Sequence, residues 1–216
     1  MAKYRLHCFA QSGNTYKVAL YLNCAGLDWE PALVDFFNGA TRTAEWRSET
    51  NAMGEAPVLE VDGKKLTQSG AILTYLAETT GHFAPADSEQ RYEALRWILY
   101  DNYRFTNYYA TRRALMCFAP EAPHPAVLDF LKLRTDAAYA VVEKHLGTMP
   151  FVAGSNPTIA DFSLAGYVYY PTEETGYDLA SSHPNIHAWS ERLKELPGWK
   201  APYDLLPGMR IAPRWR

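Results

Sequence analysis

The stretch MGEAPVLEVDGKKLTQS, residues 53–69, says more about the fold than any other part of this chain. Val58–Val61 has the composition of a strand. Asp62-Gly63 is a hairpin signal, because both positions of a type I′ turn need a positive φ. Gln68-Ser69 then opens an apolar run at helical spacing. The stretch therefore predicts a loop, a strand, a tight turn, a second strand and the start of a helix.

A proline, Pro57, stands directly before the first of these strands. Proline has no N–H to donate, so it is tolerated at a strand's first residue, and the bond before it is often cis. The backbone of Ala56 is then left to pair with something outside the sheet. Ser69 stands at the predicted helix N-terminus, where unbonded N–H groups and the helix dipole favour an anion. The segment thus predicts an extended, peptide-binding edge beside a socket for a carboxylate.

Composition excludes several classes of function. The 216 residues suffice for one large domain or two small ones, and 48% hydrophobic with 21% charged residues is ordinary for a globular protein. The net charge of −3 gives no reason to expect nucleic acid, and no apolar run is long enough to cross a membrane.

The cysteines, Cys8, Cys24 and Cys117, are odd in number and widely spaced, which predicts apolar fillers in a reducing cytoplasm. The six histidines lack metal-ligand spacing, so no metal site is expected.

The chain around the quoted stretch has two parts. Residues 4–9 and 29–34 have strand patterns, with a helix between them that ends near Gly26 and a short helix near residues 43–47. The order β-α-β-(α)-β-β-α predicts a small mixed sheet covered by helices. Residues 81–87 have glycine, prolines and no periodicity, and they mark a boundary.

The second part contains no convincing strand. Helices are predicted at 88–118, where Tyr92, Leu95 and Leu99 fall at helical spacing, at 126–146, from Thr158 onward, and at 184–196. Thr158 is expected to cap its helix, with Asp161 reaching back to the Thr158 N–H. The tail after Pro197 is expected to lie along the surface or to fray; it ends with the basic residues Arg210, Arg214 and Arg216.

Four motifs resemble those of the cytosolic glutathione S-transferases: SGNTYKV at 12–18, APVL at 56–59, QSGAI at 68–72 and PTIAD at 157–161. Each is weak alone, but together, in the family's order and spacing, they cover nearly the whole chain. The first motif is similar to that of bacterial members and of the serine-using classes. The resemblance implies an α/β thioredoxin-like domain at 1–80, a linker at 81–87 and an all-α C-terminal domain at 88–216 that includes the extended tail. It also implies a cytoplasmic homodimer that acts in detoxification.

The resemblance implies a glutathione site in the first domain, with this tripeptide as co-substrate. Ala56, followed by Pro57, would pair with its cysteinyl unit like an added strand. Gln68 and Ser69 would hold the γ-glutamyl group. Gln68 departs from the more usual acidic residue, so weaker binding is expected. The candidates for the glycine end are Arg42 and Asn51.

Ser12, directly before the first helix, is the candidate that activates the thiol. A free thiol has a pKa of about 8.5, and each unit of depression needs about 1.4 kcal/mol. A hydrogen bond to a charged acceptor contributes roughly 1.5–3 kcal/mol. A hydroxyl with a helix N-terminus would therefore lower the thiol pKa by about one to two units. The alternative is that Ser12 is a structural N-cap. Asn14 and Thr15 are reserves for the same role, and Lys17 is expected on the solvated surface.

The run YDNYRFTNYYATRR, residues 100–113, is rich in aromatic and amide side chains for a helix. The resemblance implies that Tyr103, Arg104 and Asn107 face a small hydrophobic or aromatic electrophile. Packing between helices or subunits is an equal alternative for these residues. The predicted function is a glutathione transferase of open reaction subtype. The alternative is a binding or scaffolding protein that kept the fold and lost the activity.

Overall fold

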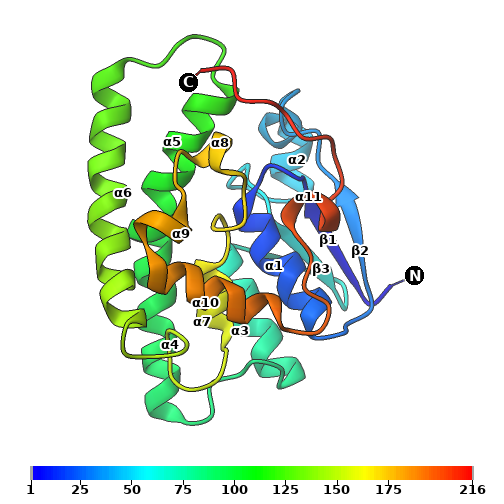
Figure 1. The fold of residues 1–216 in the computed structure, drawn as a ribbon. Helices are drawn as coiled ribbons and strands as arrows, with labels where there is room; N and C mark the ends of the chain where they lie inside the picture. The colour runs from blue at the N-terminus through cyan, green and yellow to red at the C-terminus, as the bar shows by residue number, and fades with distance from the viewer. Residues whose placement is uncertain (1, 216) are drawn as a thin grey trace. The chain divides into compact units, whose positions relative to one another are not determined.

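The quoted stretch forms half of a four-stranded sheet in the computed structural model, which describes residues 2–215 (Figure 1). The sheet belongs to the first of two compact units, made of the residues up to Ala84 together with Leu196–Arg210. The elements of this unit are β1 (Tyr4–Cys8), α1 (Gly13–Cys24), β2 (Trp29–Leu33), a 3₁₀ turn (Ala40–Arg42), α2 (Ala44–Glu49), β3 (Val58–Val61), β4 (Lys64–Thr67), α3 (Ser69–Thr80) and α11 (Pro202–Leu205).

The strands lie in the order β2-β1-β3-β4, with β1 and β2 parallel and the other two pairs antiparallel. The predicted hairpin is confirmed: Asp62 and Gly63, with φ of 48° and 74°, join β3 to β4. The register places His7 opposite Val58, and Val58 opposite Thr67. The end of β1, the start of β3 and the end of β4 therefore lie side by side.

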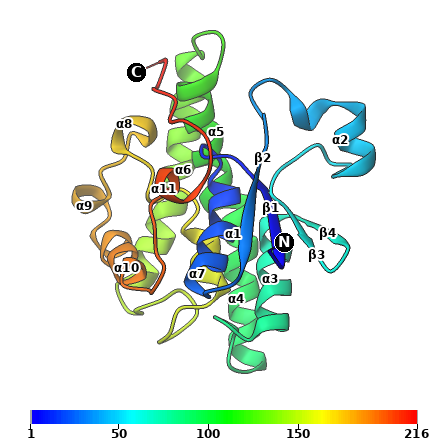
Figure 2. The same ribbon diagram turned by 90° about the vertical axis from the view of Figure 1, so that its right-hand side faces the viewer.

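Helices α1 and α3 lie on one face of the sheet (Figure 2). This face of β1 is apolar, because Tyr4, Leu6 and Cys8 alternate inward and are buried. Helix α1 is buried over most of its surface, and Lys17 is fully buried, so the expectation of a solvated lysine was wrong. His7 faces the opposite side, where its ring meets Trp46 of α2 edge-on at 5.6 Å.

The tail did not follow the predicted division. Residues 196–210 pack with the first unit, although they were expected to belong to the helical domain. Tyr16 and Asn23 of α1 donate hydrogen bonds to carbonyls of this segment, at Lys200 and Gly198, and α11 lies against α1 (Figure 1). Arg216, one of the basic tail residues, and Met1 lie outside the described residues.

The second unit comprises Pro85–Glu195 and the described residues from Ile211. None of its described helices is both long and apolar enough to traverse a bilayer, and the same holds for the described part of the first unit. Its elements are α4 (Ser88–Tyr100), a π-helical turn (Asp101–Phe105), α5 (Thr106–Phe118), α6 (Pro125–Leu146), α7 (Ile159–Leu164), α8 (Thr172–Thr175), α9 (Leu179–Ser182) and α10 (Pro184–Lys194).

The helix predicted at 88–118 is interrupted by the π-helical turn. The carboxylate of Asp101, fully buried, accepts hydrogen bonds from the Ser163 hydroxyl at 2.6 Å and the Thr106 hydroxyl at 2.5 Å. A buried carboxylate needs such partners, so these contacts explain why this residue lies inside. The prediction missed the turn because its partner at Ser163 is distant in the sequence.

The predicted cap of α7 is confirmed as a capping box. The Asp161 carboxylate accepts from the N–H groups of Thr158 at 2.8 Å and Val152 at 3.0 Å, and from the Trp189 indole at 2.9 Å. Burial raises the pKa of this carboxyl, while these hydrogen bonds act in the opposite direction. One side chain thus joins the start of α7, the loop before it and α10.

Replacing Asp161 with Ala is expected to lower the free energy of unfolding by about 3 kcal/mol or more, because each buried donor left without a partner costs about 1–3 kcal/mol. Urea denaturation measures the loss. The matched control is Asp129→Ala, at an exposed carboxylate of α6, which should change the free energy by less than about 0.5 kcal/mol. Equal losses in the two variants would contradict this account of the cap.

Candidate functional site

Three segments of the first unit converge at one end of its sheet. Ser12 follows β1, Ala56-Pro57 precedes β3, and Gln68-Ser69 follows β4. Because the register places the corresponding strand ends side by side, these segments leave the sheet at the same edge. Neighbouring strands are about 4.8 Å apart, so the segments start within reach of one small ligand.

Ser12 is the N-cap of α1, and its hydroxyl oxygen accepts a hydrogen bond from the Thr15 N–H at 3.2 Å. Its O–H donates to no group within residues 2–215, and 7% of the residue is exposed. The N–H groups of Gly13 and Asn14 likewise have no acceptor there. Ser12 can therefore be both an N-cap and a hydrogen-bond donor. Its hydroxyl oxygen accepts from the Thr15 N–H, and its O–H proton is left to donate.

The two reserve residues differ in what their side chains already do. The Thr15 hydroxyl donates to the carbonyls of Ser12 at 2.9 Å and Phe9 at 3.1 Å, and the residue is fully buried. Asn14 is half-buried, and its side-chain oxygen is enclosed without a partner among the described residues. Asn14 therefore has a side-chain amide beside Ser12 that is available to a ligand, whereas the Thr15 hydroxyl stabilises the loop between β1 and α1.

The peptide bond between Ala56 and Pro57 is cis. Neither the N–H nor the C=O of Ala56 has a hydrogen-bond partner in the described part of the chain. The loop before it is braced by Asn51, whose amide donates to the Glu55 carbonyl at 2.9 Å and whose side-chain oxygen accepts from the Met53 N–H at 3.0 Å. Asn51 thus holds the loop in place, and Ala56 presents an unpaired backbone.

Ser69 is the first residue of α3 and is only 5% exposed. Its hydroxyl has no partner within the described residues, nor do the N–H groups of Ser69 and Gly70. Gln68, which precedes it, has a φ of 66°, and its amide donates to the Glu55 carboxylate at 2.9 Å. Glu55 is the residue that sequence reasoning missed, although it stands directly before Ala56 in the quoted stretch.

Arg42 lies at the end of the 3₁₀ turn and is exposed. Its guanidinium forms no ion pair or hydrogen bond with the described residues, so the structure does not join it to the other predicted site residues. Arg47, by contrast, donates to the Ala52 carbonyl at 3.1 Å and braces the same loop as Asn51.

The tail crosses the loop that carries Ser12. The N–H of Ala10 donates to the Pro207 carbonyl at 3.0 Å, and the side-chain amide of Gln11 donates to the Met209 carbonyl. The tail therefore does not fray here, and it fixes the two residues that precede the N-cap.

Cys8 and Cys24 are not reactive thiols. Burial raises the pKa of both Cys8 and Cys24 to about 12, which disfavours the thiolate. Their prediction as fillers is confirmed for Cys8, which is fully buried. Across residues 2–215 no three histidine, cysteine or acidic side chains gather in a way that could hold a metal ion.

The structure places Tyr103 and Asn107 at exposed positions of the second unit. The Arg104 guanidinium stacks over the Tyr103 ring at 4.8 Å. Tyr103 continues a stripe of exposed apolar side chains on α4, formed by Tyr92, Leu95 and Leu99. Whether Tyr103, Arg104 and Asn107 bind an electrophile stays a prediction.

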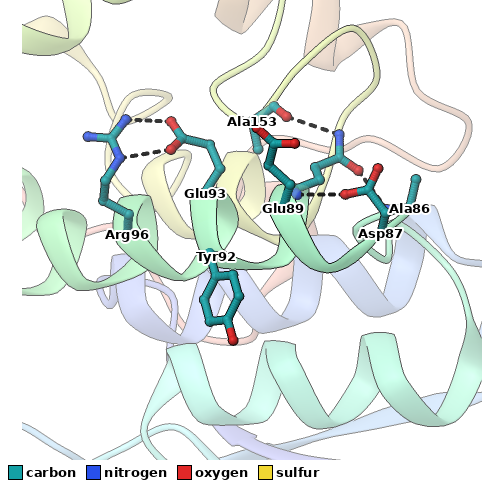
Figure 3. Close-up of a pocket in the computed structure, with 8 residues that line it drawn as sticks. Ala86, Asp87, Glu89, Tyr92, Glu93, Arg96 and Ala153 are labelled. Carbon is teal, nitrogen blue, oxygen red and sulfur yellow. Dashed lines mark hydrogen bonds and ion pairs between the residues drawn. The ribbon is translucent and has the colours of Figure 1, made fainter.

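A hollow of about 570 Å³ lies beside the start of α4 (Figure 3). Its polar groups already serve the fold: Gln90 donates to the Ala153 carbonyl at 3.0 Å, and Glu93 pairs with Arg96. None of the predicted site residues lies in it, so we assign it no function. It is lined by Ala86, Asp87, Glu89, Gln90, Tyr92, Glu93, Arg96 and Ala153.

Comparison with known proteins identifies relatives over both units. Residues 3–78 match the family model for the glutathione S-transferase N-terminal domain, and residues 110–197 match that for the C-terminal domain. Glutathione S-transferase F14 of Arabidopsis thaliana is 31% identical over 209 residues, covering 92% of this chain and 82% of its own length.

Solved structures agree. A glutathione S-transferase from Pseudomonas fluorescens has a TM-score of 0.84 and 32% identity, covering 93% of this chain and 99% of that one. A glutathione transferase from Burkholderia graminis, solved with two glutathione molecules per subunit, has a TM-score of 0.73 and 25% identity, with coverage of 90% and 88%.

Replacing Gln11 with Leu is expected to loosen the loop before Ser12, because it removes the hydrogen bond that Gln11 donates to the Met209 carbonyl of the tail. Hydrogen exchange at the Ala10 amide should become about fivefold faster, in line with the roughly 1 kcal/mol that a hydrogen bond contributes. Gln90→Leu, which removes a comparable bond to a carbonyl in the second unit, is the control and should leave this amide unchanged. Unchanged exchange in Gln11→Leu would show that the tail does not fix the loop.

Proposed function

The chain belongs to the glutathione S-transferase family, and we propose that it binds glutathione as co-substrate and activates the thiol for attack on a small hydrophobic or aromatic electrophile. We assign it to the serine-type members of bacteria, with a cytoplasmic role in detoxification. No disulfide joins Cys8, Cys24 and Cys117 in the described part of the chain, which supports a reducing compartment.

The convergence of three unpaired groups at one sheet edge is the observation that carries this proposal. The helix N-terminus at Ser69 suits a carboxylate of the γ-glutamyl group. The unpaired backbone of Ala56, followed by Pro57, suits the cysteinyl unit, which would pair as an added strand. The free O–H of Ser12 suits the sulfur of this cysteinyl unit. A tripeptide with a carboxylate at one end and a thiol in the middle matches this order of groups.

Ser12 would stabilise the thiolate by donating its hydroxyl proton in a hydrogen bond to sulfur, and the unbonded N–H groups of Gly13 and Asn14 would add the field of the helix terminus. The thiol proton passes to water, and the thiolate sulfur forms a bond to an electrophilic carbon. The electron pair of the bond that breaks leaves with the displaced group, or stays on the electrophile and takes up a proton. Conjugation and the other thiolate reactions of the family share the first step.

An apolar cluster beside Ser12 supports a hydrophobic electrophile. Phe9, at the end of β1, stacks on Phe36 with ring centroids 4.5 Å apart, and Phe37 meets both rings edge-on. Phe37 is 45% exposed, so the cluster offers an aromatic surface to solvent next to the loop of Ser12. We propose that Arg42 meets the glycine carboxylate of glutathione, since its guanidinium is exposed and has no partner among the described residues.

Replacing Ser12 with Ala is expected to raise the pKa of the bound glutathione thiol by about one to two units and to slow turnover by about 10–100-fold, because one hydrogen bond to a charged acceptor is lost. Absorbance of the thiolate against pH measures the first effect. Ser12→Thr, which keeps both a cap and a hydroxyl, should retain the low pKa.

The loss of the cap in Ser12→Ala costs about 1 kcal/mol of stability, which urea denaturation separates from the thiol effect. Ser12→Asp is the second control, because it keeps the cap and cannot donate to the sulfur. An unchanged thiol pKa in Ser12→Ala, with a raised one in Asn14→Ala, would transfer the role to Asn14. A chain that shows no retention on immobilised glutathione would favour the non-catalytic alternative.

We also propose that the protein is a homodimer, joined through the exposed stripe on α4. Tyr92, Leu95, Leu99 and Tyr103 recur every three or four residues and are 47–73% exposed. A solvent-exposed row of apolar side chains of this length is typical of a protein–protein interface. The stripe accounts for Tyr103 as a contact between subunits, which the sequence left as an alternative.

Replacing Leu99 with Glu is expected to convert the dimer to a monomer, because a charge would be buried without a partner. Light scattering after size exclusion measures the mass. Leu133→Glu places the same charge at another exposed leucine, on α6, and should leave the dimer intact. Dissociation by Leu133→Glu alone would locate the interface on α6.

A further inference from the structure

The carboxylate of Glu55 is held beside the start of α3. Its oxygen Oε2 accepts from the Gln68 amide at 2.9 Å, and its main-chain carbonyl accepts from Asn51 at 2.9 Å. Gln68 is fixed in turn, because its carbonyl accepts from the Ile72 N–H at 2.9 Å in the first turn of α3. Both ends of the Glu55–Gln68 contact are therefore tied to the backbone around the carboxylate socket.

The conformation of Gln68 supports a functional role. Its φ of 66° lies in the left-handed region, which non-glycine residues adopt rarely and mostly at ligand-binding positions. The contact with Glu55 also settles how the Gln68 amide is oriented. A carboxylate can only accept, so Nε2 faces Glu55 and Oε1 is left to accept from a ligand.

Glu55 has no positive partner among the described residues. The nearby cations have other contacts: Arg47 donates to the Ala52 carbonyl, and Lys65 donates to the Glu49 carbonyl and lies 3.8 Å from Glu60. Glu55 is exposed, so its second oxygen is open to a ligand. An amide oxygen and an unpaired carboxylate side by side form an acceptor for a cation.

Glutathione carries such a cation next to the carboxylate that the start of α3 at Ser69 would bind. In its γ-glutamyl unit, the α-ammonium and the α-carboxylate share one carbon atom. A carboxylate bound by Ser69 therefore brings the ammonium close to Gln68, the preceding residue. We propose that Glu55 supplies the negative charge that recognises the α-ammonium of glutathione, with Gln68 Oε1 as its neutral partner. This inference rests on the proposed function, and it makes Glu55 a determinant of specificity for ligands with a free α-amino group.

The test compares two ligands, glutathione and its des-amino analogue, in which glutaric acid replaces the glutamate. Their dissociation constants are measured by calorimetry for the wild type and for Glu55→Gln. Glu55→Gln is expected to weaken the binding of glutathione about tenfold, the effect of losing one charged hydrogen bond, and to leave the analogue unchanged. Glu49→Gln, at an exposed carboxylate of α2, is the control and should change neither constant.

The double variant with Glu55→Gln and Gln68→Glu restores a carboxylate at the adjoining side chain. It should regain most of the affinity for glutathione, because the charge returns to the same place. Failure to regain it would show that the shape of Glu55 matters and not its charge, which overturns the proposal.

The remaining outcomes separate the inference from the proposed function. A Glu55→Gln variant that binds both ligands as the wild type does, or loses both equally, overturns the role of Glu55 while glutathione binding stands. A wild type that binds neither ligand overturns both.

Discussion

The site depends on the register of β1, β3 and β4. This register sets the end of β1 beside the start of β3 and the end of β4, so that Ser12, Ala56 and Ser69 leave the sheet at one edge. A slip of one residue would turn every side chain of the slipped strand to the other face. The buried alternation of β1 against α1 and α3 excludes that slip, so the packing of the core also fixes the geometry of the site.

The Ser12 O–H, the Ala56 backbone and the start of α3 at Ser69 stay unpaired among the described residues, because other side chains stabilise the loops around them. Asn51 and Arg47 brace the loop before Ala56, and Thr15 closes the turn before α1. The Ser12 oxygen can therefore cap the helix and still offer its proton. The tail contributes from the far end of the chain, because it bonds to Ala10 and Gln11. A binding site that is rigid before the ligand arrives loses less entropy on binding.

The helical unit shows how far a periodic pattern can be interpreted. The spacing of Tyr92, Leu95 and Leu99 correctly predicts a helix, yet these side chains are exposed, and the buried face of α4 is formed by Ala94, Trp97 and Ile98. Periodicity identifies a helix with an apolar stripe, but it does not say whether that stripe meets the core or another molecule. Lys17 is the converse case, because a lysine is rarely buried and α1 encloses it nonetheless.

The sequence by itself determined the hairpin at Asp62-Gly63, the helix start at Ser69 and the cap at Thr158, because each depends on a few adjacent residues whose conformational preferences are strong. It also determined the family, through the order and spacing of four motifs along nearly the whole chain. Only the tertiary structure decided that Glu55 bonds to Gln68, that Asp101 bonds to Ser163 and that the tail reaches Ala10. Glu55 and Gln68 lie on opposite sides of the β3–β4 hairpin, 13 residues apart, and the other two contacts join residues far apart in the chain. No local preference encodes them, since they form only when the packing of the core has brought the segments together.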